Sequence, residues 1–267
     1  LRRGGYGQSL GPRTAETERI HAEFHAGKAE VEARYQSLVA ELRSSAPLLR
    51  AAKLGRTPGV AARILRVLDR QGLLERLRVV GTNALCAYEM HYGVFFRAEL
   101  LASGDIDLLV DAREGLKLAL EVEEQGLLGL LREADKSFRL LPEASYRAVN
   151  DRGYYVDLIK PMPKPAWKSE RTRLARAGED LQAVEIDALK WLLSAPALEQ
   201  VVIGEDGIPA RMKVPDIRVF AAYKHWLAEQ PGREPIKRLR DREQAASAVD
   251  VARRFAVPMA ELDRELQ

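Results

Sequence analysis

The pair Asp105 and Asp107, separated by a single isoleucine, restricts the fold of this chain more than any other feature. It opens the apolar, partly β-branched run 106–110, which predicts a buried strand. Side chains two residues apart on a strand project from the same face, so the two carboxylates repel each other unless a cation lies between them. Because Asp-x-Asp pairs are also common at exposed strand starts, the pair alone indicates a metal site only weakly.

A glycine turn precedes this strand in the sequence. The apolar run 77–80 leads into Gly81 and Thr82, and a helical pattern follows from Ala84. A turn of this kind between a strand and a helix lets backbone N–H groups and a hydroxyl approach phosphate oxygens closely. Together with the aspartate pair, Gly81 and Thr82 favour a site that binds a metal and a phosphorylated ligand.

A third carboxylate, Asp157, interrupts the otherwise apolar strand pattern 154–159. A charge at such a position is costly without a partner. Beside Asp105 and Asp107, it would complete a set of oxygen ligands suited to Mg²⁺ or Mn²⁺. We therefore predict that the three aspartates converge in space and that no arginine neutralises any of them.

The pattern of the remaining segments predicts an α+β fold. Apolar spacings of three, four and seven indicate helices, and alternation indicates strands. Predicted helices cover 14–49, 57–72, 84–90, 116–131, 186–193, 220–227 and 238–255, and predicted strands cover 77–80, 106–110, 138–149, 154–159 and 201–203. The residue types at 150–153 favour a tight reversal, which predicts a hairpin between two of these strands.

Net charge, the lengths of the apolar runs and the number of cysteines limit the classes of protein to which this chain can belong. The 267 residues contain 42 Lys and Arg against 39 Asp and Glu, a net charge of +3 that by itself predicts no nucleic-acid partner. No apolar run approaches the roughly 18 residues of a membrane-spanning helix. The single cysteine, Cys86, cannot form an intramolecular disulfide, which favours a reducing, cytoplasmic location.

The combination of Gly81-Thr82, Asp105-x-Asp107 and Asp157 resembles the motif of the DNA polymerase β-like nucleotidyltransferases. That motif is a Gly-Ser or Gly-Thr turn, an Asp-x-Asp or Asp-x-Glu pair and a third Asp on a later strand. A bacterial branch of the family is similar over 77–251, chiefly at 80–85, 103–109, 220–224 and 237–241. The gap between Gly81 and Asp105 is longer than is common in the family, so extra structure is expected at 92–101, and a tyrosine stands at 223 where a histidine is expected.

The resemblance implies a small mixed or antiparallel sheet flanked by helices, with helical regions at both ends of the chain. It implies a tail and helix in 1–56, a nucleotidyltransferase core in 57–165, and a mostly helical region in 166–267 that completes the nucleotide cleft. Asp105, Asp107 and Asp157 would be the catalytic and metal-binding residues, and Asp157 would accept the proton of the attacking hydroxyl. The residues that would contact the nucleotide are Gly81, Thr82, Lys224, Lys237 and Arg240.

The implied enzyme moves a nucleoside monophosphate from a nucleoside triphosphate (NTP) to a hydroxyl, with release of pyrophosphate. Mg²⁺ or Mn²⁺ would be the cofactor, and the acceptor would be a small molecule, an RNA end or a protein side chain. Two alternatives stay open: a non-catalytic nucleotide-binding or interaction protein with the same fold, and the toxin half of a toxin–antitoxin pair with an antitoxin-like partner. Lys224 lies in an apolar helical run, so a lysine that extends past packed neighbours fits the pattern as well as a phosphate contact does.

Overall fold

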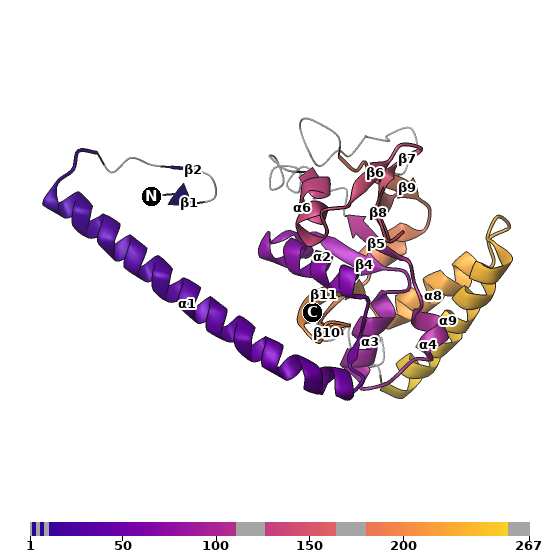
Figure 1. The fold of residues 1–267 in the computed structure, drawn as a ribbon. Coiled ribbons are helices and arrows are strands. Elements are labelled where there is room, and N and C mark those ends of the chain that lie inside the picture. The colour runs from indigo at the N-terminus through magenta and orange to yellow at the C-terminus, as the bar shows by residue number, and fades with distance from the viewer. Residues whose placement is uncertain (1, 4–5, 8–10, 111–125, 164–179, 256–267) are drawn as a thin grey trace, which may run out of the picture.

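A long N-terminal helix dominates the outline of the molecule. The computed structural model describes residues 2–3, 6–7, 11–110, 126–163 and 180–255. Two short paired strands, β1 (Arg2–Arg3) and β2 (Tyr6–Gly7), precede α1 (Ala15–Ala51). Thr14 caps this helix, because its side chain accepts a hydrogen bond from the backbone N–H of Thr17. The helix extends away from the rest of the molecule (Figure 1), which confirms the predicted N-terminal helix and leaves most of it exposed.

A six-stranded mixed sheet forms the centre of the molecule. Its main path is β4 (Leu77–Val80), β5 (Asp105–Val110), β8 (Tyr155–Pro161), β7 (Ala144–Val149) and β6 (Arg139–Leu141), and β9 (Val184–Ile186) also pairs with β8. Strand β5 runs antiparallel to β4 and parallel to β8, while β7 and β8 form the predicted hairpin. The predicted strand 138–149 is interrupted, because β6 and β7 turn back and pair with each other.

A second sheet has three strands, β11 (Pro209–Pro215), β10 (Ala197–Gly204) and β3 (Gly55–Thr57). Strand β10 pairs antiparallel with β11 and parallel with β3. Of these strands, the sequence pattern predicts only the part of β10 at 201–203.

Helices pack on both faces of the central sheet. They are α2 (Gly59–Arg70), α3 (Ala84–Tyr92), α4 (Ala98–Leu101), α6 (Gly126–Ala134), α7 (Leu189–Ser194), α8 (Ile217–Ala228) and α9 (Pro235–Phe255), with a 3-10 turn η1 (Leu73–Glu75) after α2. The extra structure expected at 92–101 is α4. The predicted helix 116–131 lies partly outside the described residues, and its last turns belong to α6. The predicted helix 186–193 is shorter than expected, because its start belongs to β9.

The two faces of the central sheet bury different sets of side chains, and this positions the aspartates. Ile106 of β5 joins the larger core, together with residues of α2, α3 and α6. Leu109 joins a smaller core with residues of α7 and α8, including Tyr223. Because side chains alternate along a strand, Asp105 and Asp107 lie on the face of Leu109. The aspartate pair therefore faces α7 and α8, away from the larger core.

The observed architecture is the predicted α+β fold, a mixed sheet flanked by helices with helical regions at both ends. Among the helices of the described ranges, none combines the length and the apolar character needed to cross a membrane. The boundaries 1–56, 57–165 and 166–267 stay a prediction.

Candidate active site

The three predicted aspartates share one face of the central sheet. The parallel pairing of β5 and β8 sets Asp107 directly beside Asp157. Asp105 lies two residues before Asp107 on β5, so its side chain projects from the same face. Neighbouring strands lie about 4.8 Å apart, so the carboxylates of Asp107 and Asp157 meet across the ladder. Burial, reinforced by the charges of Asp105 and Asp157, raises the pKa of Asp107 to about 7. The structure therefore brings the trio together as predicted.

An arginine neutralises one member of the trio. Arg147 of β7 pairs in register with Asp157, and its Nε and Nη2 atoms each donate a 2.6 Å hydrogen bond to a different carboxylate oxygen. Its guanidinium also lies over the ring of Tyr155, 4.9 Å from the centroid, and hydrogen bonding to Asp157 raises the pKa of Arg147 above its usual range. The expectation of an arginine-free trio is therefore wrong at Asp157. Within the described residues, no group of three or more His, Cys, Asp or Glu side chains is arranged to hold a metal ion.

The glycine turn lies against the aspartate pair. Gly81 has φ of +70°, and a Cβ atom built on it would collide with the carboxylate of Asp107. Only glycine allows both this backbone conformation and this close approach. The neighbouring Thr82 is buried, and its hydroxyl oxygen accepts a 3.2 Å hydrogen bond from Nε2 of Gln244 on α9. Gly81 thus borders the carboxylates, while the Thr82 hydroxyl contacts α9.

We expect Gly81→Ala to reduce the activity of this site by about a hundredfold or more, because the added methyl group displaces Asp107 and small misplacements at reacting centres are that costly. Steady-state kinetics measure the loss. Gly93→Ala is the matched control, since Gly93 also has a positive φ of +64° but an added methyl group there would meet nothing within 4 Å. An equal loss of activity in both variants would mean that backbone strain, and not the contact with Asp107, causes the effect.

Asp105 is held at the first position of β5 by three side chains. Ser103 donates a hydrogen bond from its hydroxyl to the Asp105 carboxylate. Asn83 and Tyr154 donate to the backbone oxygen of Asp105, at 2.6 Å and 3.1 Å. These contacts come from the start of α3, the 101–104 segment and the β7–β8 turn. These hydrogen bonds hold the start of β5, where the aspartate pair lies, in place.

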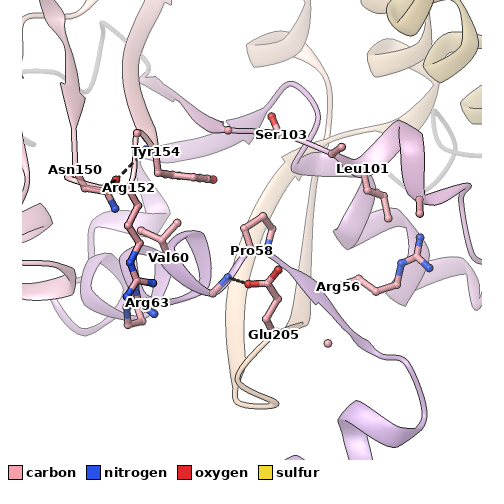
Figure 2. A pocket seen from close by; sticks show the side chains of 16 residues that line it. Arg56, Pro58, Val60, Arg63, Leu101, Ser103, Asn150, Arg152, Tyr154 and Glu205 are labelled. Carbon is pink, nitrogen blue, oxygen red and sulfur yellow. Dashed lines mark hydrogen bonds between the residues drawn. The ribbon is translucent and has the colours of Figure 1, made fainter.

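A cavity of about 600 Å³ adjoins this edge on the side of α2. Ser103 and Tyr154 line one wall, and Pro58 and Glu205 line another (Figure 2). The carboxylate of Glu205 accepts a 2.9 Å hydrogen bond from the backbone N–H of Gly59, at the N-terminus of α2. The cavity thus reaches Ser103 and Gly104, the two residues directly before Asp105.

Each of the cationic residues predicted to contact a nucleotide has a hydrogen-bond or ion-pair partner within the protein. Lys224 is buried and donates a 2.7 Å hydrogen bond from Nζ to Asp241 of α9. Lys237 pairs with Glu234 at the surface, with 3.1 Å between Nζ and Oε1. Arg240 donates to the backbone oxygen of Ala102 at 3.1 Å. Their roles in phosphate binding stay predictions, as do those of Gly81 and Thr82.

Comparison with known proteins places the chain in a family. The model of a family described as nucleotidyltransferase matches residues 60–266. None of the curated protein sequences compared with the chain matches it. Among solved structures, the solution structure of the antibiotic-resistance factor ANT(2'')-Ia is similar at 18% sequence identity and a TM-score of 0.36, over 78% of this chain and 91% of that one. The assignment rests on the family model, which spans most of the chain and both strands of the aspartate trio, so this chain belongs to the nucleotidyltransferase family and is an enzyme of that class.

Proposed function

We propose that this nucleotidyltransferase moves a nucleoside monophosphate from an NTP to a hydroxyl acceptor with release of pyrophosphate, and that Asp105 and Asp107 hold the divalent cation that this reaction uses. The observation that supports the proposal most is the burial of Asp107 beside Asp105 and Asp157: burial, together with these two neighbouring charges, raises the pKa of Asp107 to about 7. Carboxylates crowded in this way are typical of functional sites, because a bound cation or proton relieves the repulsion between Asp105 and Asp107.

The carboxylate oxygens of Asp105 and Asp107 are ligands suited to Mg²⁺ or Mn²⁺. Mg²⁺ is usually bound by one or two carboxylates together with substrate phosphates, so the pair Asp105 and Asp107 suffices without a cage of protein ligands. Such an ion, when bound, stabilises negative charge on the reacting phosphates. Because Arg147 occupies both oxygens of Asp157, we assign the metal to Asp105 and Asp107 and not to all three aspartates.

Arg147 and Asp157 then have linked roles. A guanidinium binds phosphate oxygens in the same bidentate manner as it binds a carboxylate. Transfer of Arg147 from Asp157 to the triphosphate would free the Asp157 carboxylate. In the reaction, the acceptor oxygen forms a bond to the α-phosphorus, the bond to the pyrophosphate oxygen breaks, and the freed Asp157 accepts the hydroxyl proton. The same residue pair thus links NTP binding to the availability of a base.

Two experiments, one on NTP binding and a second on transfer of the nucleoside monophosphate, test this proposal. Calorimetric titration with each NTP is expected to show binding that requires Mg²⁺ or Mn²⁺ and disappears with EDTA. Incubation of each α-phosphate-labelled NTP with separate pools of RNA, small hydroxyl compounds and protein is then expected to label one pool and release pyrophosphate. Binding that is equal with and without metal would contradict the assignment of Asp105 and Asp107, and tight binding with no transfer to any pool would contradict the proposed reaction.

A further inference from the structure

We propose that α1 is a dimerisation element, which pairs antiparallel with α1 of a second copy of this chain. The surface is separate from the aspartate face, and several large apolar side chains on it are exposed. Three observations support the pairing: a regular apolar stripe on α1, a groove beside the C-terminal half of the stripe, and opposite charges on the two halves of the helix.

The stripe repeats every eleven residues. Ile20, Val31 and Leu42 are separated by this interval, and so are Phe24 and Tyr35. Eleven residues make slightly more than three full turns of a straight α-helix, so these side chains stay on one side along the whole of α1. Val31 is nevertheless 69% exposed and Tyr35 50% exposed. A regular stripe with this degree of exposure is typical of a helix that packs against another helix.

A groove of about 650 Å³ lies where the C-terminal half of α1 meets the body of the protein. Tyr35, Val39 and Leu42 line it from α1, and Val67 and Ile208 line it from α2 and the β10–β11 turn. The groove also contains five arginines against three carboxylates. Its apolar floor and excess of positive charge fit an amphipathic segment that carries acidic residues beside an apolar stripe.

The N-terminal half of α1 is such a segment. Residues 15–32 contain five glutamates and two Lys or Arg, whereas residues 33–51 contain one glutamate and three arginines. A parallel pair would set like charges together, but an antiparallel pair sets the acidic half of each helix against the basic half and the groove of the other. Two-fold symmetry then uses both grooves and closes the assembly at two chains. The same chain therefore carries both complementary surfaces, which favours a second copy over a different protein.

Sedimentation equilibrium of the full chain, over a range of concentrations, measures the association. We expect a dimer whose dissociation constant rises with salt, because complementary charges are screened. Val31→Asp should raise this constant about a hundredfold or more, since two carboxylates enter the helix interface without partners. Ala33→Asp is the matched control, because Ala33 lies on the opposite side of α1 and is exposed. A monomer at all concentrations, or a dimer equally sensitive to both substitutions, would overturn the proposal.

Crosslinking tests the orientation. In an antiparallel pair, Phe24 of one subunit lies near Leu42 of the partner subunit, whereas the two copies of Phe24 are about 27 Å apart, from the rise of a helix. A short bis-maleimide should therefore link a mixture of Phe24→Cys and Leu42→Cys chains but neither variant alone. The natural Cys86 is buried, and burial raises the pKa of its thiol to about 12, which keeps it unreactive. A crosslink formed by Phe24→Cys alone would indicate a parallel pair and exclude the antiparallel one.

Discussion

Asp107→Asn should lower the rate of nucleotidyl transfer by about a thousandfold or more while leaving the melting temperature unchanged or raised. The rate falls because the amide removes one of the two carboxylates proposed to hold the cation, and the charge of such a ligand is worth several kcal/mol at the transition state. Stability is kept, because the substitution removes a buried charge and its repulsion with Asp105 and Asp157, which together raise the pKa of Asp107 to about 7. Transfer kinetics, metal-dependent NTP binding and calorimetric melting measure the three effects. Asp105→Ala should behave similarly.

Asp151→Asn is the control for this prediction, because Asp151 is an exposed aspartate at the end of the same hairpin, with its side chain 75% exposed beside Arg139. It should change neither transfer nor metal-dependent binding. A large loss of stability in Asp107→Asn would instead show that Asp107 forms a structural ion pair. Normal transfer in Asp107→Asn would exclude the residue from the metal site.

Asp241→Ala is expected to cause the largest loss of stability, about 3–5 kcal/mol, because removing one partner of a buried ion pair leaves the other charge uncompensated. Asp241 is fully buried on α9 and accepts 2.7 Å hydrogen bonds from Lys224 of α8 and from Arg233. Burial lowers the pKa of Lys224, and Asp241 opposes that shift, so the lysine loses its main support in the variant. Denaturation with urea measures the free energy of unfolding.

The double variant Lys224→Met with Asp241→Leu separates packing from charge. It should recover much of the loss, because two apolar side chains of similar size leave no buried charge. Asp151→Ala again serves as the exposed comparison, since ion pairs at the surface contribute about 1 kcal/mol or less. A loss of that small size in Asp241→Ala would show that water or another group already compensates Lys224.

Part of the convergence of the aspartates is predictable from the sequence, because that part depends on short-range rules. Alternation along β5 places Asp105 and Asp107 on one face, and the hairpin brings the strand of Asp157 into the same sheet. The apolar neighbours of Asp157 predict its burial, and it is buried. The parallel pairing of β5 with β8, which sets Asp157 beside Asp107, joins segments far apart in the sequence and does not follow from these rules.

Arg147 is not predictable because its position depends on the hairpin register. A four-residue turn at 150–153 would pair Val149 with Tyr154 and put Arg147 on the opposite face from Asp157. In the structure, Asn150 accepts a hydrogen bond from the backbone of Tyr154 and lengthens the turn, so Val149 pairs with Tyr155. A shift of one residue moves every side chain of a strand to the other face. Asn83 and Gln244, which contact Asp105 and Thr82, depend in the same way on tertiary placement.

The ion pair between Arg147 and Asp157 lowers the negative charge that an approaching triphosphate meets at the aspartate face. Three bare carboxylates on one face would repel a triphosphate before any cation could bridge them, and a field of that sign slows association. The guanidinium cancels one of these charges and lies over the ring of Tyr155. An acidic reaction centre can thus admit a highly charged substrate, because its own counter-ion is supplied by the neighbouring strand.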